Sequence, residues 1–91
     1  MDLIRINTST QVSTVACFIK MLVLDCGGSA SVALRIYDEA TSSETTASRK
    51  LTMRNTEGEL TKVIIFPGRG LRLPNGCWMA YEGGEVFYAL G

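Results

Sequence analysis

The chain has 91 residues, with nine basic and nine acidic side chains, three cysteines and no histidine. Histidine is the commonest general base and the commonest metal ligand, so its absence excludes Ser-His-Asp and Cys-His catalysis and most zinc and haem sites. Zero formal net charge provides no long-range field to gather nucleic acid or an anionic membrane. We therefore expect no cofactor, no metal, no nucleic-acid partner and no membrane partner.

Size and cysteine usage bound the class of protein further. A domain of this length buries only somewhat more than about 60% of its unfolded surface, so an oligomer or a larger assembly would add to a thin margin of stability. The longest apolar run is about half the roughly 20 residues that a membrane-spanning helix needs, and the segment MDLIRINTS lacks the pattern of a secretory signal. The cysteines, Cys17, Cys26 and Cys77, lack metal-knuckle spacing and favour a reducing compartment. We expect a soluble, non-secreted protein.

The N-terminal residues predict an edge strand or arm. Residues 3–6 are strand-like, and a polar run follows them up to residue 14. We therefore divide the chain into a leader, 1–14, that pairs at a sheet edge or reaches onto a neighbour, and a single β-sandwich domain, 15–91.

Residues 15–24 form the most apolar stretch, in which Lys20 is the only charge. Strand alternation predicts a core-facing set consisting of Val15, Cys17, Ile19, Met21 and Val23. The opposite face then carries Phe18, Leu22 and Leu24 around Lys20. Because exposed apolar patches often mark interfaces, this outer face is covered either by the protein's own loops or by another subunit. Phe18, Leu22 and Leu24 are accordingly candidate interface residues.

Two glycine pairs predict tight hairpins. Gly27-Gly28 would join residues 15–24 to an antiparallel strand over 32–38, and Gly83-Gly84 would join 77–82 to 86–90. Between these hairpins, residues 39–48 contain no large apolar side chain and predict a surface loop, either a partner contact or simply solvated.

The remaining segments are also strand-sized. Residues 50–54 predict a weaker strand and 60–66 a strongly apolar one that ends at Pro67. Trp78 is either an interface residue or part of the core. No stretch has helical periodicity, so the sequence predicts an all-β fold, a compact antiparallel β-sandwich or small barrel of about seven to eight short strands.

The order of these features resembles a class of small β-sandwich virion proteins of tailed bacteriophages, of the marine and cyanobacterial podovirus type. The similarity covers roughly residue 15 to the C-terminus. The stretches that carry it are ACFIKMLVL, VALRIYDEATSS, VIIFPGRGLRL, PNGCWMAYEGG and VFYALG.

The resemblance implies a non-enzymatic structural protein, foremost a capsid decoration or cement protein that docks on the phage head. Its partners would be the major capsid protein or other virion proteins, and a homo-oligomer, a trimer among the options, would be expected. The expected location is the capsid surface of the virion, after synthesis in the host cytoplasm.

Two other functions compete with this one. A sugar-binding or host-adhesion module of a fibre or knob would use exposed aromatic side chains, foremost Trp78, with Tyr37 and Tyr81. An enzyme would need a carboxylate pair drawn from Asp25, Asp38, Glu39, Glu44 and Glu82, each of which lies at a turn or strand end. We expect no enzymatic activity.

Overall fold

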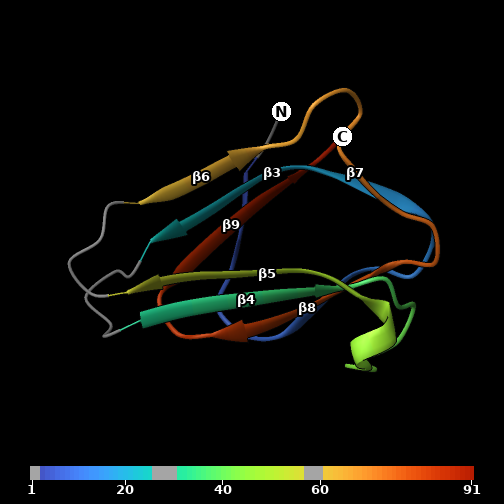
Figure 1. Ribbon diagram of the computed structural model, residues 1–91, viewed down its shortest axis with the longest axis horizontal. Helices are drawn as coiled ribbons and strands as arrows, with labels where there is room; N and C mark the ends of the chain where they lie inside the picture. Colours follow the sequence, from blue (N-terminus) through green and yellow to red (C-terminus); the bar gives the residue numbers. More distant parts are fainter. Residues whose placement is uncertain (1–2, 26–30, 57–60) are drawn as a thin grey trace.

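The computed structural model describes residues 3–25, 31–56 and 61–91, which form two antiparallel sheets packed face to face (Figure 1). The first sheet, sheet A, contains, in spatial order, β1 (Ile4–Ile6), β9 (Glu85–Leu90), β3 (Cys17–Asp25) and β6 (Lys62–Ile65), and β7 (Leu71–Leu73) also pairs with β3. The second, sheet B, contains β2 (Thr10–Ser13), β8 (Cys77–Glu82), β4 (Ser31–Tyr37) and β5 (Arg49–Thr56). A short 3₁₀ turn, η1 (Thr46–Ser48), precedes β5. The predicted all-β antiparallel sandwich is confirmed.

The chain passes from one sheet to the other at most of its connections. Sheet A has the order β1-β9-β3 followed by β6 and β7 on one edge of β3, and sheet B has the order β2-β8-β4-β5. If β6 and β7 are counted as one interrupted strand, this is the eight-strand order of a jelly roll.

Both predicted hairpins are wrong. β3 lies in sheet A and β4 in sheet B, and β8 and β9 are divided between the sheets in the same way. Gly27 and Gly28 lie outside the described residues, whereas Gly83 and Gly84 have φ angles of 66° and 73°. Glycine at positive φ allows a chain to reverse but does not determine whether the next strand stays in the same sheet. Each of these four strands is apolar on its inner face, so each can pair with distant strands and face its sequence neighbour across the core.

The leader residues lie at the edges of both sheets. β1 pairs with β9, with Ile4 opposite Tyr88, and β2 pairs with β8, with Thr10 opposite Met79. The leader is therefore an integral part of both sheets.

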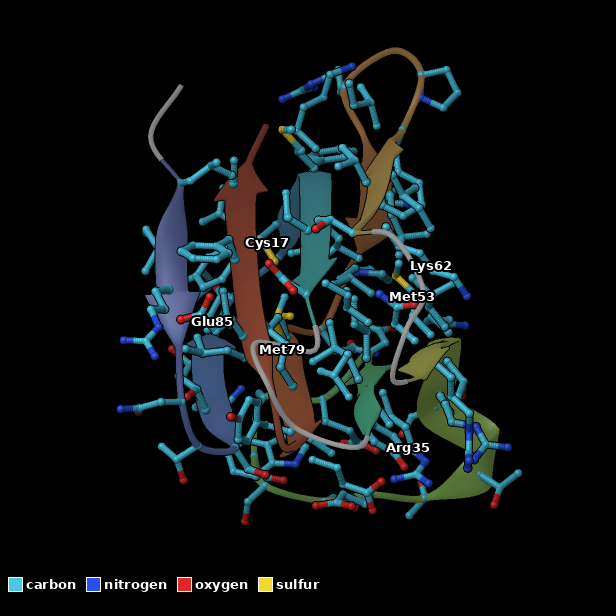
Figure 2. The ribbon with its side chains drawn as sticks, turned by 90° about the vertical axis from the view of Figure 1, so that its left-hand side faces the viewer. Cys17, Arg35, Met53, Lys62, Met79 and Glu85 are labelled. Atoms are coloured by element: carbon cyan, nitrogen blue, oxygen red, sulfur yellow. The ribbon has the colours of Figure 1, made fainter. Side chains whose placement is uncertain are left out.

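The core lies between the two sheets and draws on both. Its fully buried members include Leu22, Leu24 and Val86 from sheet A and Leu34, Ile36 and Met79 from sheet B. One polar side chain, Asn55, is also fully buried, and its Nδ2 donates a hydrogen bond to the carbonyl of Leu24 at 3.4 Å. In Figure 2, Met79 lies in the interior and Arg35 toward the surface.

A β-bulge in β3 changes which side chains face the core. The register with β9 shifts between Ile19 and Met21, so the alternation of faces is interrupted there. Ile19 is fully buried before the shift, and Leu22 and Leu24 are fully buried after it. The prediction that Met21 and Val23 face the core and Leu22 and Leu24 face outward is therefore wrong, because it assumed unbroken alternation.

The turn between β6 and β7, residues 66–70, packs against this bulge. The Phe66 amide donates to the Lys20 carbonyl at 3.0 Å. The Lys20 ammonium donates in return to the carbonyls of Phe66 and Gly68, at 2.7 and 2.6 Å. Gly70 has φ 112°, and a Cβ there would meet the Ile19 carbonyl. The bulge and the turn thus hold each other in place.

Candidate docking surface

The carboxylates considered for catalysis make separate contacts. Glu44 accepts a hydrogen bond from Trp78 Nε1 at 3.1 Å, and Glu39 accepts one from Thr45 at 3.2 Å. Glu82 forms an ion pair with Arg35 at 3.4 Å. Asp25 ends β3 and has an interaction of its own.

Asp38 holds two connections together at one end of the sandwich. It is buried, and its carboxylate accepts hydrogen bonds from the Asn75 amide at 2.8 Å and from Asn75 Nδ2 at 3.2 Å. Its own amide donates to the Ser48 carbonyl at 2.9 Å. These contacts join the end of β4 to the β7–β8 turn and to the turn before β5. Asp38 therefore has a structural role.

The described cysteines are packed thiols. Cys77 is fully buried and Cys17 is half-buried, and both are free. Burial raises the pKa of the Cys77 thiol from its ordinary value of 9.0 to about 12, and the pKa of Cys17 is raised for the same reason. Both thiols therefore stay protonated, and weakly reactive, at neutral pH. Cys26 lies outside the described residues.

The described residues form neither a pocket nor a cluster of three or more side chains suited to hold a metal ion. In the same residues, no helix is long and apolar enough to cross a membrane.

The four candidate interface residues lie in different environments. Phe18 is half-buried and lies opposite the exposed Arg72, so it faces outward from sheet A. The Arg69 guanidinium lies 4.5 Å from the centre of its ring, in cation–π range. Leu22 and Leu24 are fully buried between the sheets and offer no surface to a partner.

Trp78 faces outward from sheet B. It is half-buried, lies outside the core cluster, and pairs with Gln11 on one side and Tyr37 on the other. Tyr37 itself is buried. Since Nε1 of Trp78 is bonded to Glu44, the indole joins β8 to the loop before η1.

The outer face of sheet A is an apolar surface, which we call the A-face. Across the strands, Phe87, Val23 and Val63 lie side by side, with Arg5 beyond Phe87 on β1, and in the next row Met21 and Ile65 lie side by side next to the buried Ala89. Val63 is 52% exposed and Ile65 is 65% exposed. Contiguous apolar surface of this kind is typical of a docking site.

The sequence predicted an apolar outer face on residues 15–24, and Phe18 does face outward, but Leu22 and Leu24 were assigned to that face in place of Met21 and Val23. Met21, Val23, Val63, Ile65 and Phe87 were all missed as surface residues. The charge of Lys20 gave no sign of the bulge, because unbroken alternation also places Lys20 on the outer face.

The outer face of sheet B, the B-face, is polar by contrast. One row across its strands consists of Glu82, Ala33 and Arg54, and the next of Ala80, Arg35 and Thr52. Four of these six positions therefore hold charged or hydroxyl side chains, whereas the corresponding positions of the A-face hold apolar ones.

No protein-family model matches this chain, and neither a curated protein nor a solved structure matches it.

Proposed function

We propose that this chain is a non-enzymatic structural protein of a phage particle, a capsid decoration or cement protein that docks on the head through the A-face. The observation that carries the proposal is the apolar outer face of sheet A, with Val63 and Ile65 more than half exposed. Docking would bury this surface, and binding to a preassembled shell would stabilise the small domain by mass action.

Two further points support a virion setting. The first is the sequence resemblance to small β-sandwich virion proteins. The second is the jelly-roll strand order, which is frequent among viral capsid domains but also serves lectins and cupins. Since one fold hosts many functions, the strand order adds support for the setting and none for the docking surface.

The direct test is to look for the chain in purified particles and count its copies. A decoration protein should be present at high copy number on the capsid, and absence of the chain from purified particles contradicts the proposal. A trimer or other homo-oligomer belongs to the same proposal and is tested by size-exclusion chromatography with light scattering.

Matched variants locate the docking surface. Met21→Gln with Val23→Thr makes the middle of the A-face polar and should weaken association with particles while leaving the domain folded. Arg35→Gln, in the middle of the B-face, is the control and should dock normally. Equal docking by both variants would exclude the A-face as the contact.

A second candidate function is favoured by Trp78. Its outward position on the B-face, beside Glu44, is the kind of site at which an indole stacks on a sugar ring. A sugar-binding or host-adhesion module predicts that Trp78 fluorescence changes with some member of a glycan panel. An unchanged signal across the panel, with Trp78→Phe retaining host attachment, would reject it.

A further inference from the structure

The free edge of sheet A combines backbone and side-chain features that suit an added strand. Within the described residues, β6 pairs only with β3, and no strand covers its other edge. Edge strands present unpaired amides and carbonyls that can template another strand, and proteins often protect them with charge or proline. The β6 side chains on the outer face of sheet A are Val63 and Ile65, and both are exposed.

The backbone groups of these same two residues point away from β3. Phe66 donates its amide to the Lys20 carbonyl, which makes 20 and 66 a hydrogen-bonded pair. In an antiparallel ladder such pairs alternate with non-bonded ones. Leu22 and Leu24 are therefore bonded to Ile64 and Lys62, in the observed register. The amides and carbonyls of Val63 and Ile65 consequently face the open edge.

The neighbouring edge of sheet B is basic. β5 lies on the same side of the sandwich as β6, where Figure 2 shows Met53 and Lys62 near each other. The Lys62 ammonium donates a hydrogen bond to the Arg54 carbonyl across the two edges. β5 and β6 carry four exposed basic side chains and no acidic one: Arg49, Lys50, Arg54 and Lys62. Glu57 and Glu59, between the strands, lie outside the described residues.

These features define the partner. We propose that the β6 edge binds an extended segment of another protein in which apolar and acidic residues alternate. In an added strand, side chains on one side would continue the apolar row of Val63 and Ile65. Those on the other side would lie over the edge of sheet B, where the exposed charged side chains of β5 and β6 are all basic and carboxylates are favoured. Main-chain bonds supply affinity and the alternating side chains supply specificity in this mode of recognition.

A second copy of the chain does not supply a strand in which apolar and acidic residues alternate. The edge strands β1, β2, β5 and β6 contain no acidic residue. Pairing of β6 with the β6 of a second copy would also bring two basic β5 edges together, and like charges in juxtaposition oppose association. The partner is therefore a different protein. The inference deepens the proposed function, and it rests on that function for the claim that this chain docks on another protein.

The first experiment uses peptides. A short synthetic peptide that alternates valine with glutamate should bind the intact chain, protect the Val63 and Ile65 amides from hydrogen exchange, and bind more weakly as salt is added. A peptide with lysine in place of glutamate, and one with the same residues in two blocks, should bind at least about tenfold more weakly, a difference of about 1.4 kcal/mol. Equal binding of the three peptides, or protection confined to β1, would overturn the proposal.

The second experiment uses a matched pair of variants. Ile65→Pro removes the outward amide without touching a β3 bond, whereas Ile65→Thr keeps the amide and removes apolar area. Ile65→Pro should lose peptide binding about tenfold or more, while Ile65→Thr should bind at an intermediate level. A variant with Lys50→Glu and Arg54→Glu should reverse the preference toward the lysine peptide. Peptide binding unchanged in a folded Ile65→Pro variant would contradict strand addition.

Particle association separates this inference from the proposed function. If the chain is found on particles and its Ile65→Pro variant docks normally, the proposed function stands and the β6 edge is refuted as the contact. A chain absent from particles would refute the proposed function, and the peptide measurements would still decide whether the edge binds acidic strands.

Discussion

The A-face and the B-face differ in chemistry although their sheets share one core. In corresponding rows, the A-face presents Phe87, Val23 and Val63, and the B-face presents Glu82, Ala33 and Arg54. An antiparallel sheet needs only one apolar face to fold against its partner, and the other normally carries polar side chains. Sheet B follows that pattern. Sheet A has a second apolar face that the fold does not require, which is why we associate docking with it.

The largest expected effect is a difference in stability loss between substitutions on the inner and the outer face of sheet A. Leu22→Ala should lower the free energy of unfolding by about 2–5 kcal/mol, because it leaves a cavity in the core. Val23→Thr, one residue further along, should cost less than about 1 kcal/mol, since threonine suits an exposed strand position. Urea unfolding of both variants provides the measurement. A Val23→Thr cost equal to that of Leu22→Ala would show that the A-face is covered within the monomer.

The next largest effect is expected in the turn of residues 66–70, which packs against the bulge in β3. The bulge determines which β3 side chains lie on the A-face. Gly70→Ala should destabilise the domain by about 1–3 kcal/mol, because its φ of 112° is unfavourable for alanine and its Cβ would meet the Ile19 carbonyl. Gly68→Ala is the control. With φ 62° and open space around a Cβ, it should cost only about 1 kcal/mol. Thermal unfolding that ranks the two variants in the opposite order would argue against close packing of the turn on β3.

Alkaline pH should weaken the core without changing the apolar docking chemistry. Burial raises the pKa of Cys77 from 9.0 to about 12 and also raises the pKa of Cys17 and Tyr88. Above the ordinary pKa the unfolded chain loses protons that the folded chain retains, so the free energy of unfolding falls as pH rises through this window.

Urea unfolding at a series of pH values measures this loss, and Cys77→Ala should reduce its slope whatever its effect at neutral pH. The main A-face side chains, Met21, Val23, Val63, Ile65 and Phe87, do not titrate. Particle association should therefore hold across the window until the domain unfolds. A stability profile with the same slope in Cys77→Ala would exclude Cys77 as a contributor.

The smallest effect belongs to the B-face. The side chains of Arg35 and Glu82 are 24% and 60% exposed, and ion pairs in such positions contribute about 0–1 kcal/mol. Arg35→Gln should therefore change the free energy of unfolding by no more than about 1 kcal/mol and leave docking intact. Salt titration provides a second measurement, because the remaining difference should shrink as ionic strength rises.

Local patterns in the sequence predicted the fold class but not the pairing of strands. The apolar runs, the β-branched residues of 60–66 and the glycine and proline punctuation identify strands because each is a local property. The two glycine pairs misled, since a reversal of the chain looks the same whether the next strand joins the same sheet or crosses to the other. That choice depends on which distant strands compete for the same edge.

The candidate surface was predicted in outline and wrong in detail for a similar reason. An apolar outer face was expected from residues 15–24, and Phe18 does face outward. Leu22 and Leu24 do not, because the bulge at Lys20 is stabilised by the carbonyls of Phe66 and Gly68, which are far away in the sequence. No pattern within β3 alone contains that information.

The pairing of β1 with β9 has a consequence for how the chain folds. Ile4 lies opposite Tyr88, so sheet A cannot be completed until the residues of β9 have left the ribosome. Topologies dominated by such distant pairings fold slowly, in about milliseconds to seconds, because the entropy of closing long loops is lost before the contacts form. During that interval β3 has no β9 beside it, and the apolar side chains on both of its faces can contact neighbouring nascent chains.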